Sequence, residues 1–516
     1  MRTSGEGFRA LIATRRHFRF LRAVVARPIV WLGFGLLWIA SLAQAQPSES
    51  IREPHAHRPP GTDLTQPTAS KPATRPDFKN LRFDEVWTSA TRSGHWDDLI
   101  KAIPLVPRPT ITLTLAGQAR WREEWFRGFN FSSQDDDNGQ SRLLLSADLQ
   151  FGTRQRLHGR VFAEGRDAQS YGRNLPGGAR PADADRLDVQ NLFADVAFGD
   201  SWVRYGRQEI AVNRERLFGV PDWANTRSAA QGTRAHLVRG AFTVELLDAH
   251  PMIVRQTGVN RADSSARIRT VSFGSASGAA PLARGLPGVW QGYWYEQVIR
   301  TPATPTRRLT SGGRTLWRWS GNATSPRAWS LEVEGAVQHG HAGPRTLDGW
   351  FWVAESQVTW RRTRGAPTLA LGLETASGER ASTSTRQEAF AVLYPAAHAH
   401  GGYADVIGRT NARELHLIGT WDPYKALALR GAWYYVDRLR TDDGLYTKQN
   451  AVFRAASGST DRHAFDELDI TGTWKVTRHW SVIAGGAVVV PGPFLRNTPA
   501  GARSERWGFA GTAFTF

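Results

Sequence analysis

The chain of 516 residues contains no cysteine, and beyond Leu42 it has no run of 18 apolar residues. The first absence excludes a disulfide framework and a thiolate metal site. The second excludes a membrane protein built from helices, but not one built from strands, which cross a bilayer without such runs. A closed, hydrogen-bonded sheet is one way to stabilise an exported chain of this length without disulfides.

The chain also lacks the usual signatures of an enzyme. It has neither a G-x-S-x-G nucleophile setting nor a phosphate-cradling P-loop, so we expect no enzymatic activity, no catalytic residues and no cofactor. His339 with His341, and His398 with His400, have alternate spacing but no acidic cluster beside them, so no metal site is expected. Residues 135–139, DDDNG, lack the spacing of a calcium loop and are interpreted as a solvated external hairpin.

The first 45 residues have the organisation of a secretory signal peptide. Arginines at positions 9, 15, 16, 19, 22 and 27 precede an apolar run from Ile29 to Leu42, and Ala43-Gln44-Ala45 offers a small-residue cleavage site. The run is shorter than the roughly 20 residues of a membrane span. Thr14-Arg15-Arg16-His17-Phe18 has the look of a twin-arginine signal, so the Sec and Tat routes both stay open.

The formal net charge is +18. Residues 1–45 hold seven arginines and one glutamate, which leaves +12 on the rest of the chain. A basic balance indicates an anionic partner, which could be lipid headgroups, an acidic solute or nucleic acid. For an exported protein we expect no nucleic-acid partner, and because the arginines fall on the polar face of strands we expect their field to be concentrated inside the structure.

Residues 111–166 show the most informative pattern, because every second residue is apolar in three successive segments. Leu113, Leu115 and Trp121 belong to the apolar set of the first segment, and Arg120 and Arg122 lie between them. A strand sends alternate side chains to opposite faces, so each segment has one apolar and one charged face. The pattern fits a soluble sandwich, with its polar face in water, or a membrane barrel, with its polar face toward a lumen.

Similar segments recur to the end of the chain, with turn-rich separators between them. With the three segments at 111–125, 142–151 and 156–166, the candidates are residues 187–198, 202–207, 233–238, 241–248, 267–273, 292–300, 315–319, 328–338, 351–361, 368–375, 414–421, 426–435, 465–474, 481–489 and 507–516. The chain also has 21 Trp, 24 Phe and 50 Gly, which suit aromatic girdles and tight turns. The sequence therefore predicts an all-β fold, a transmembrane antiparallel barrel of about 18 strands (16 to 18).

The domain organisation follows from these patterns. We expect a signal peptide at 1–45, a disordered Pro-rich linker at 46–80, a short helix or plug-like segment at 81–105 and the barrel at 106–516. The longer separators, residues 132–141, 169–186, 208–231, 377–413 and 438–464, are candidate external loops, and some are expected to lie inside the mouth. The last residue, Phe516, resembles the assembly signal of Gram-negative outer-membrane barrels.

Three stretches resemble motifs of one family. Residues 205–227 read YGRQEIAVNRERLFGVPDWANTR, residues 394–417 read YPAAHAHGGYADVIGRTNARELHL, and residues 484–496 read AGGAVVVPGPFLR. They are similar to the "GRQEL…RL…DW.NT.R" stretch, the late "YP…H.GYAD…N.R.LHL" segment, and the penultimate strand and loop of the alginate export family. The resemblance spans roughly residues 110–516.

The resemblance implies an 18-stranded outer-membrane barrel, whose characterised representative exports the polyuronate alginate through a pore lined by positive groups. One departure concerns the solute. Asn497-Thr498-Pro499 follows the third motif where relatives often have an acidic residue and Lys before Thr. The family label is also wider than one activity, so the identity of the anion stays open.

The candidate site residues are the arginines of the polar strand faces and of one inward loop. Guanidinium groups bind carboxylates bidentately, and a polyuronate has a carboxylate on each sugar. The predicted pore lining is Arg120, Arg122, Arg142, Arg156, Arg160, Arg166, Arg204, Arg207 and Arg234 from strands, with Arg214, Arg216 and Arg227 from a loop. Transport requires release, so Glu124, Asp148, Glu164 and Asp195 are expected to pair with these arginines and temper them.

These features predict a passive channel in the outer membrane of a Gram-negative bacterium that exports an anionic exopolysaccharide. An uptake porin for small organic anions would share the arginine face. A surface barrel enzyme is the rival from another class, and it would need a compact catalytic group at one rim. The expected partners are outer-membrane lipid, an acidic polysaccharide or small anionic solute, the barrel assembly machinery through Phe516, and periplasmic export proteins.

Overall fold

The computed structural model describes residues 75–106, 111–152, 157–175, 177–275, 288–302, 304–319, 325–380, 385–394, 396 and 398–516. The expected signal peptide, the linker up to residue 74, and Arg156 lie outside the described residues. Within the described ranges, no helix is long and apolar enough to cross a bilayer.

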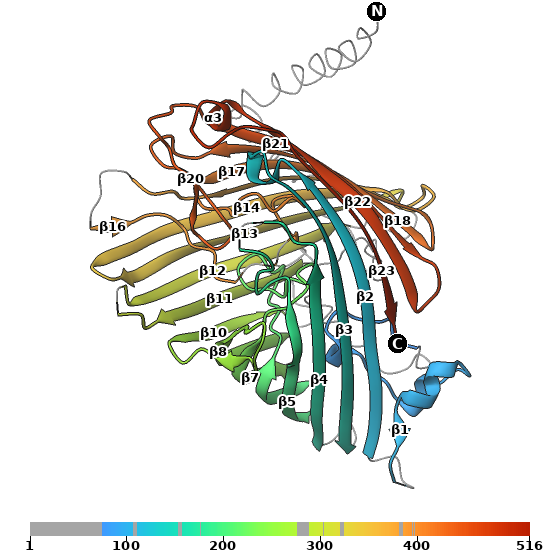
Figure 1. The fold of residues 1–516 in the computed structure, drawn as a ribbon. Coiled ribbons are helices and arrows are strands. Elements are labelled where there is room, and N and C mark those ends of the chain that lie inside the picture. The colour runs from blue at the N-terminus through green and yellow to red at the C-terminus, as the bar shows by residue number, and fades with distance from the viewer. Residues whose placement is uncertain are drawn as a thin grey trace, which may run out of the picture.

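The described chain forms a closed antiparallel β-barrel of 18 strands (Figure 1). The wall strands are β2 (Ile111–Arg127), β3 (Asp135–Gly152), β4 (Leu157–Tyr171), β5 (Asp185–Phe198), β6 (Ser201–Gln208), β7 (Ala230–Arg239), β8 (Phe242–Ile253), β10 (Ala266–Ser275), β11 (Gly288–Ile299), β12 (Thr306–Trp319), β13 (Arg327–Ala342), β14 (Arg345–Trp360), β15 (Thr368–Ala376), β17 (Ala412–Tyr424), β18 (Leu427–Arg438), β21 (His463–Lys475), β22 (Trp480–Pro491) and β23 (Glu505–Thr515). Each wall strand pairs with its neighbours in the chain, and β23 pairs with β2, so the sheet has no free edge.

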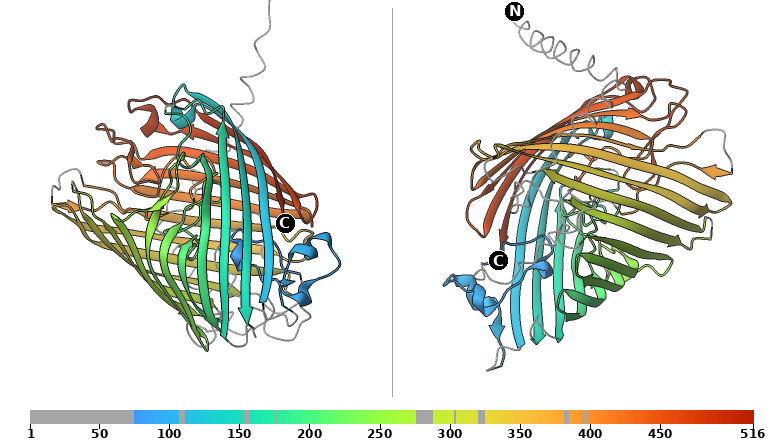
Figure 2. Two further views of the ribbon diagram at one scale, coloured as in Figure 1. Left: turned by 60° about the horizontal axis from the view of Figure 1, so that its bottom comes forward. Right: turned by 180° about the vertical axis from the view of Figure 1, so that it is seen from behind.

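Shorter elements lie at the two ends of the wall. They are the strands β1 (Ile103–Pro104), β9 (Arg261–Ala262), β16 (Arg386–Gln387), β19 (Leu445–Tyr446) and β20 (Val452–Arg454), the 3-10 turns η2 (Arg82–Asp84), η3 (Ser89–Thr91), η4 (Trp96–Ile100) and η5 (Phe129–Phe131), and the helix α3 (Pro493–Arg496). Residues 75–106 and the C-terminus lie near the start of β2 (Figures 1 and 2). The longest connections lie at the other end of the strands, which corresponds to the extracellular end of such barrels.

The wall confirms the alternation predicted from the sequence. In β2 the apolar Trp121 is 43% exposed, whereas its neighbour Arg122 is 3% exposed. The same contrast holds between Leu145 at 53% and Arg142 at 1% in β3. The apolar faces therefore point outward and the charged faces point into the barrel, which is the arrangement of a membrane barrel and the reverse of a soluble sandwich.

All 18 predicted segments correspond to one wall strand each, but several strands are longer than predicted. β3 begins at Asp135, so residues 135–141 are strand and not part of a loop, and the predicted solvated hairpin at 135–139 is wrong. Asp136 there is buried and accepts a hydrogen bond from the backbone N–H of Asn174 at 2.6 Å. Alternation of apolar residues cannot detect strand ends that project past the bilayer, because both of their faces are polar.

β23 closes the barrel by pairing with β2 over residues 506–515, and Phe516 extends this pairing by one residue. The N–H of Phe516 donates to the carbonyl of Gly117, and the N–H of Gly117 donates to the carbonyl of Phe516, both at 3.0 Å. Glycine is required at position 117, because a Cβ there would lie 2.6 Å from the Phe516 ring. The terminal aromatic ring thus packs directly on β2.

Residues 75–106, which include the segment expected to be a short helix or plug, form 3-10 turns and the strand β1. The Phe83 ring packs edge-on against Phe162 and Phe193 of the lumen wall, with ring centroids 5.6 and 5.2 Å apart. The Arg204 guanidinium lies over the Phe83 ring at 4.6 Å, and Arg160 donates to the Phe83 carbonyl at 2.7 Å. Part of this segment therefore occupies the lumen near the periplasmic end.

Candidate functional site

The loop between β6 and β7, residues 209–229, crosses the lumen. Asp222 and Trp223 contact β2 and β3, while Arg216 contacts β13. β2 and β13 lie on opposite sides of the wall, since about half of the strands separate them by either route. We call residues 209–229 the crossing loop; it contains most of the first family-like motif.

Arginines hold one end of the crossing loop. The Arg142 side chain is 1% exposed and donates to the Asp222 carboxylate at 2.9 Å, to the Asp222 carbonyl at 3.1 Å and to the Ala224 carbonyl at 3.3 Å. Arg120 donates to the Asp222 carbonyl at 2.8 Å, and Arg227 bonds the Asp222 carboxylate at 3.3 Å. Charge-assisted bonds of this kind are among the stronger ones, so this end of the loop is firmly anchored.

Trp223 packs beside this anchor. The Arg122 guanidinium lies 4.1 Å over its ring and donates to its carbonyl at 2.7 Å. The Trp223 indole N–H donates to Glu124 at 3.0 Å, and its ring meets Phe509 of β23 edge-on at 4.7 Å. An indole whose N–H has a hydrogen-bond acceptor and whose ring packs on apolar side chains suits a buried position of this kind.

The other end of the crossing loop meets carboxylates on the far wall. Arg216 is 2% exposed and pairs with Glu332 and, at 3.0 Å, with Glu334 of β13. Arg214 pairs with Glu332 at 3.4 Å and with Glu355 of β14 at 3.3 Å. The loop is therefore tied to both walls by ion pairs.

A second loop, residues 377–411 between β15 and β17, joins the first inside the barrel. The N–H of Gly219 donates to the carbonyl of Tyr394 at 2.8 Å, and the N–H of Tyr394 donates to the carbonyl of Leu217 at 2.9 Å. Ile210, Val212, Leu217 and Phe218 of the crossing loop share an apolar cluster with Phe390 and Leu393 of the second loop and with Tyr293, Tyr295 and Phe351 of the wall. Together the two loops form a constriction with its own apolar core. This second loop holds most of the second family-like motif.

Burial and nearby charges perturb the ionisable groups of these loops. Burial raises the pKa of Asp222, but Arg142, Arg227 and Arg120 together hold it well below its usual range. Burial lowers the pKa of His400 well below its usual range, and Arg216 and Arg409 add to that effect. Burial also lowers the pKa of Lys448 to about 8. His400 and Lys448 line a cavity of about 30 Å³ at the second loop.

Glu215 gives the crossing loop a dependence on pH. Its carboxyl is fully buried, accepts a bond from the N–H of Val220 at 2.7 Å, and has its pKa raised by burial from 4.5 to about 9. A raised pKa in the folded loop means that protonation favours the folded loop. This stabilisation is complete below pH 4.5 and is lost as the pH rises toward about 9.

We therefore expect the constriction to loosen in alkali. Single-channel recordings of the protein across this pH range should show longer or larger openings as the pH rises, and Glu215→Gln should remove most of the dependence, because an amide cannot ionise. A steep pH response in Glu215→Gln equal to that of the unaltered protein would show that another group controls the loop.

The predicted arginines that the structure describes are buried or half-buried, and most of them bind carboxylates. Arg160 pairs with Asp148 and Arg204 with Asp195, both at 2.7 Å, Arg122 pairs with Glu124 at 2.7 Å, and Arg207 pairs with Asp188 at 3.2 Å. Arg166 binds Asp185, Arg234 binds Glu245 at 3.1 Å, and Arg227 binds Glu209 at 2.5 Å. Three of the four predicted acidic partners thus contact predicted arginines; Glu164 instead accepts from Asn191 at 2.9 Å.

Arg120 differs from these ion-paired arginines. Its guanidinium donates to three carbonyl oxygens and to the Asn225 side chain, at 2.8 to 3.4 Å, and to no carboxylate among the described residues. Arg308 of β12 likewise donates to the neutral Gln297 at 2.6 Å. Around the anchored end of the crossing loop, the guanidinium groups of Arg120, Arg122, Arg142 and Arg227 cluster with the carboxylates of Glu124, Glu209 and Asp222, and Glu164 lies beside Arg227. Among these four arginines, Arg120 is the one that no carboxylate of the described residues binds directly.

The acidic part of the far wall was missed by the sequence analysis. Glu332, Glu334, Glu355, Glu374 and Glu414 line the barrel interior on β13, β14, β15 and β17, where they meet Arg214, Arg216, Arg409 and His416. The signal was present, because Glu332 and Glu334 alternate with apolar residues exactly as the arginines of β2 do. The lumen therefore has a face rich in arginine and a face rich in carboxylates.

The paired histidines of the sequence have separate surroundings. The His398 ring stacks on Trp507 at 5.3 Å and is tilted against Trp223 at 4.9 Å between centroids, while His400 bonds the Arg214 carbonyl at 2.6 Å. His339 and His341 lie near the extracellular end of β13. In the described parts of the chain no group of three or more histidine or acidic residues has the geometry to hold a metal ion.

Comparison with known proteins identifies the family. The sequence profile described as "Alginate export" matches residues 111–509, which is more than three quarters of the chain. The chain belongs to the alginate export family. No curated protein matches the sequence of this family member.

The fold of this alginate export family member resembles that of outer-membrane porins of Pseudomonas aeruginosa. OccK2 (OpdF) is 12% identical with a TM-score of 0.54, covering 78% of this chain and 97% of that one. OccK8 (OprE) is 9% identical with a TM-score of 0.53, and the match covers 79% of this chain and 98% of OccK8. OpdK, in a structure with vanillate, is 11% identical with a TM-score of 0.52, and the match covers 78% of this chain and 98% of OpdK. Family and fold together support an outer-membrane β-barrel channel.

Proposed function

We propose that this protein is a passive channel that exports an anionic exopolysaccharide, an alginate-like polyuronate, across the outer membrane. The observation that carries the proposal is the cluster of arginines at the anchored end of the crossing loop, in a member of a family described by alginate export. A polymer with one carboxylate on each sugar meets guanidinium groups that can bind it bidentately.

The ion pairs of the lumen support transport more than tight binding. Asp148, Asp195 and Glu124 already occupy part of the hydrogen-bonding capacity of their arginines. A passing carboxylate then exchanges one partner for another, which keeps each site weak enough to release the chain. Arg120 binds neutral groups in the described structure, so a passing carboxylate would not have to displace another carboxylate from it.

Neutralising Arg120 tests the role of the arginine face. We expect Arg120→Gln to lower the ratio of anion to cation permeability in planar bilayers, because one positive charge of the cluster disappears while the glutamine amide keeps one donor for the loop carbonyls. Arg307→Gln is a matched control, because Arg307 is 64% exposed at the rim and pairs with Glu296 at 2.7 Å. An unchanged permeability ratio in Arg120→Gln, measured from the reversal potential under a salt gradient, would refute this role.

Uptake of small organic anions is the alternative with a specific observation behind it. The two inward loops narrow the lumen, and OpdK, of similar fold, has been solved with vanillate, a small carboxylate. Both functions use an anion-attracting route, and neither requires a catalytic group at a rim. Passage of a polymer separates them, since a small-anion porin would not thread a polyuronate.

The proposed function also implies partners for export and for assembly of the barrel. The basic and apolar N-terminal segment supports delivery through a signal peptide. Phe516, which ends the closing strand against Gly117, suits recognition by the barrel assembly machinery. Periplasmic export proteins would contact the end of the barrel where residues 75–106 lie, and outer-membrane lipid would cover the apolar outer face.

A further inference from the structure

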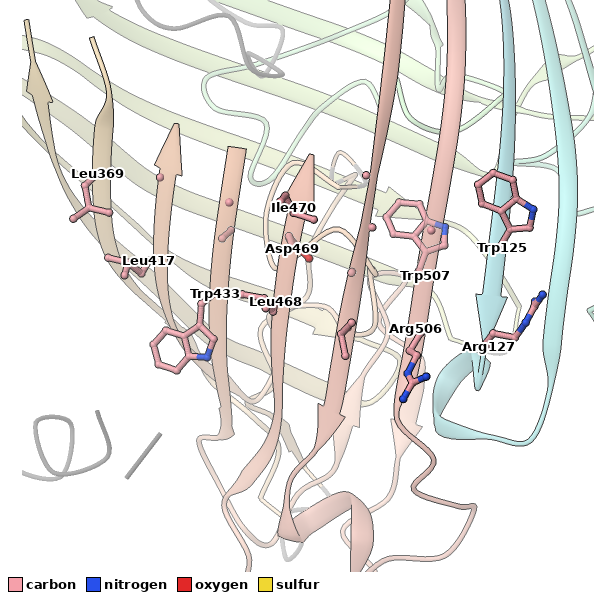
Figure 3. A pocket seen from close by; sticks show the side chains of 18 residues that line it. Trp125, Arg127, Leu369, Leu417, Trp433, Leu468, Asp469, Ile470, Arg506 and Trp507 are labelled. Atoms are coloured by element: carbon pink, nitrogen blue, oxygen red, sulfur yellow. The ribbon is translucent and has the colours of Figure 1, made fainter. Parts of the chain in front are cut away.

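The outer face of the wall has a groove of about 860 Å³ across β15, β17, β18, β21, β22, β23 and β2 (Figure 3). Its floor follows one row of cross-strand neighbours, Leu369, Gly419, Gly431, Ile470, Gly486, Gly508 and Trp125. The groove faces away from the lumen, because Ile470 is 71% exposed while the adjacent Asp469 points inward at 1%. It is thus a feature of the lipid-facing surface and independent of the solute.

Glycine makes the floor deep, and at two of these positions no contact with the described residues requires glycine. A Cβ added at Gly419 or Gly431 would lie no closer than 3.9 Å to the described atoms beyond its two neighbours in sequence. Neither residue has a positive φ. Glycine inside a strand weakens it, and it often marks a place where a ligand approaches the backbone closely. The missing side chains therefore leave space for something outside the chain.

The residues that line the groove on its extracellular side change from apolar to basic along the row. The next row of neighbours runs Leu417, Trp433, Leu468, Val488, Arg506 and Arg127. Figure 3 shows Trp433, Leu468, Arg506 and Arg127 following one another across the strands. An apolar channel that ends at two guanidinium groups matches an amphiphile with an anionic head.

Arg506 and Arg127 are direct cross-strand partners, which is unfavourable for two like charges. Arg127 donates to Asp137 at 2.5 and 3.0 Å. Arg506 is exposed and has no ion pair or hydrogen bond from its side chain within the described ranges. A phosphate between the two side chains would relieve their repulsion and give Arg506 a partner. Both arginines lie at the extracellular end of their strands, where a lipid of the outer leaflet has its headgroup.

We propose that this groove binds a lipid of the outer leaflet whose phosphate headgroup has a net negative charge, with the phosphate at Arg127 and Arg506 and an acyl chain along the glycine floor. A second copy of the chain fits less well, because it would bring the same two arginines or an apolar face against them. The headgroup chemistry alone would also suit free phosphate, so the test must separate a lipid from an ion.

Native mass spectrometry of the full chain from detergent micelles tests this site. Micelles are doped with bis-phosphorylated lipid A or with phosphatidylcholine, and the lipid retained on each barrel is counted. We expect the unaltered protein to retain lipid A in preference to phosphatidylcholine. Arg127→Gln combined with Arg506→Gln should reduce that preference severalfold, because both guanidinium groups are lost.

Gly431→Leu should fill the floor and reduce retention of lipid A without lowering the unfolding temperature of the barrel, so loss of binding cannot be ascribed to misfolding. Arg413→Gln is the matched control, because Arg413 is also exposed on this outer face but pairs with Asp437 away from the groove. It should retain lipid A like the unaltered protein. Equal retention of both lipids, unchanged retention in the arginine and glycine variants, full displacement by inorganic phosphate, or a mass of two chains without lipid would each overturn the proposal.

Discussion

Replacing Arg142 with methionine is expected to enlarge the conducting path of the channel. The methionine roughly keeps the length of the side chain but removes its four hydrogen bonds, three to the crossing loop and one to Gln118. Loss of one partner of a fully buried ion pair costs about 3–5 kcal/mol, and the cost here is smaller because the Asp222 side chain is 34% exposed to solvent. Asp222 keeps Arg227, but at 3.3 Å and from within the same loop. The loop should therefore leave the wall for part of the time, and single-channel conductance should rise severalfold.

The barrel itself should survive this substitution. The wall hydrogen bonds of β3 involve its backbone, and the outward face of the strand is unchanged. Arg307→Met removes an arginine at the exposed rim and should leave conductance as it was. If Arg142→Met conducts like the unaltered protein while remaining folded by circular dichroism, the crossing loop does not limit the path.

Replacing Phe83 with alanine should open the periplasmic end of the lumen. Phe83 is 4% exposed, and its ring packs on Phe162, Phe193 and the Arg204 guanidinium. Truncation of a buried phenylalanine costs about 3–5 kcal/mol. Because residues 75–106 add only the short strand β1 to the sheet, this loss should release the segment and not unfold the barrel. We expect a rise in conductance and faster proteolysis of residues 75–106.

Trp96→Ala is the control for Phe83→Ala. Trp96 belongs to the same segment, but it is 53% exposed and stacks on Phe514 at the periplasmic end of the wall. Its loss should leave the lumen contacts of Phe83 in place and the conductance unchanged. Equal effects of the two substitutions would mean that the segment acts by its attachment to the rim and not by filling the lumen.

The wall could be predicted from the sequence because strand alternation is local. Alternate residues of β2 or β3 face opposite sides of the wall, so the position of a residue along the strand fixes its face. Lipid outside the barrel requires an apolar side chain at every second position. Strand ends could not be predicted so well, as Asp135 at the start of β3 shows. Beyond the bilayer both faces of a strand are polar, and the pattern that identifies it disappears.

The constriction could be predicted only in part. The alternation predicted that Arg142 and Arg160 point into the barrel, and nearby Asp148 was a predictable partner of Arg160. The contacts that build the constriction join residues far apart in the chain, such as Arg216 with Glu332 and Leu217 with Tyr394. No local pattern encodes these pairs, because they depend on the position that the crossing loop takes inside the closed barrel.

The measurement that tests the central claim most directly is the ion selectivity of the full-length protein in a planar bilayer, before and after addition of a polyuronate. The proposed function predicts a channel that prefers anions and is blocked by polyuronate, because the polymer occupies the arginine face at the crossing loop. A neutral glucan of similar length should leave the current unchanged. A cation-selective channel, or one indifferent to polyuronate, would contradict the proposal.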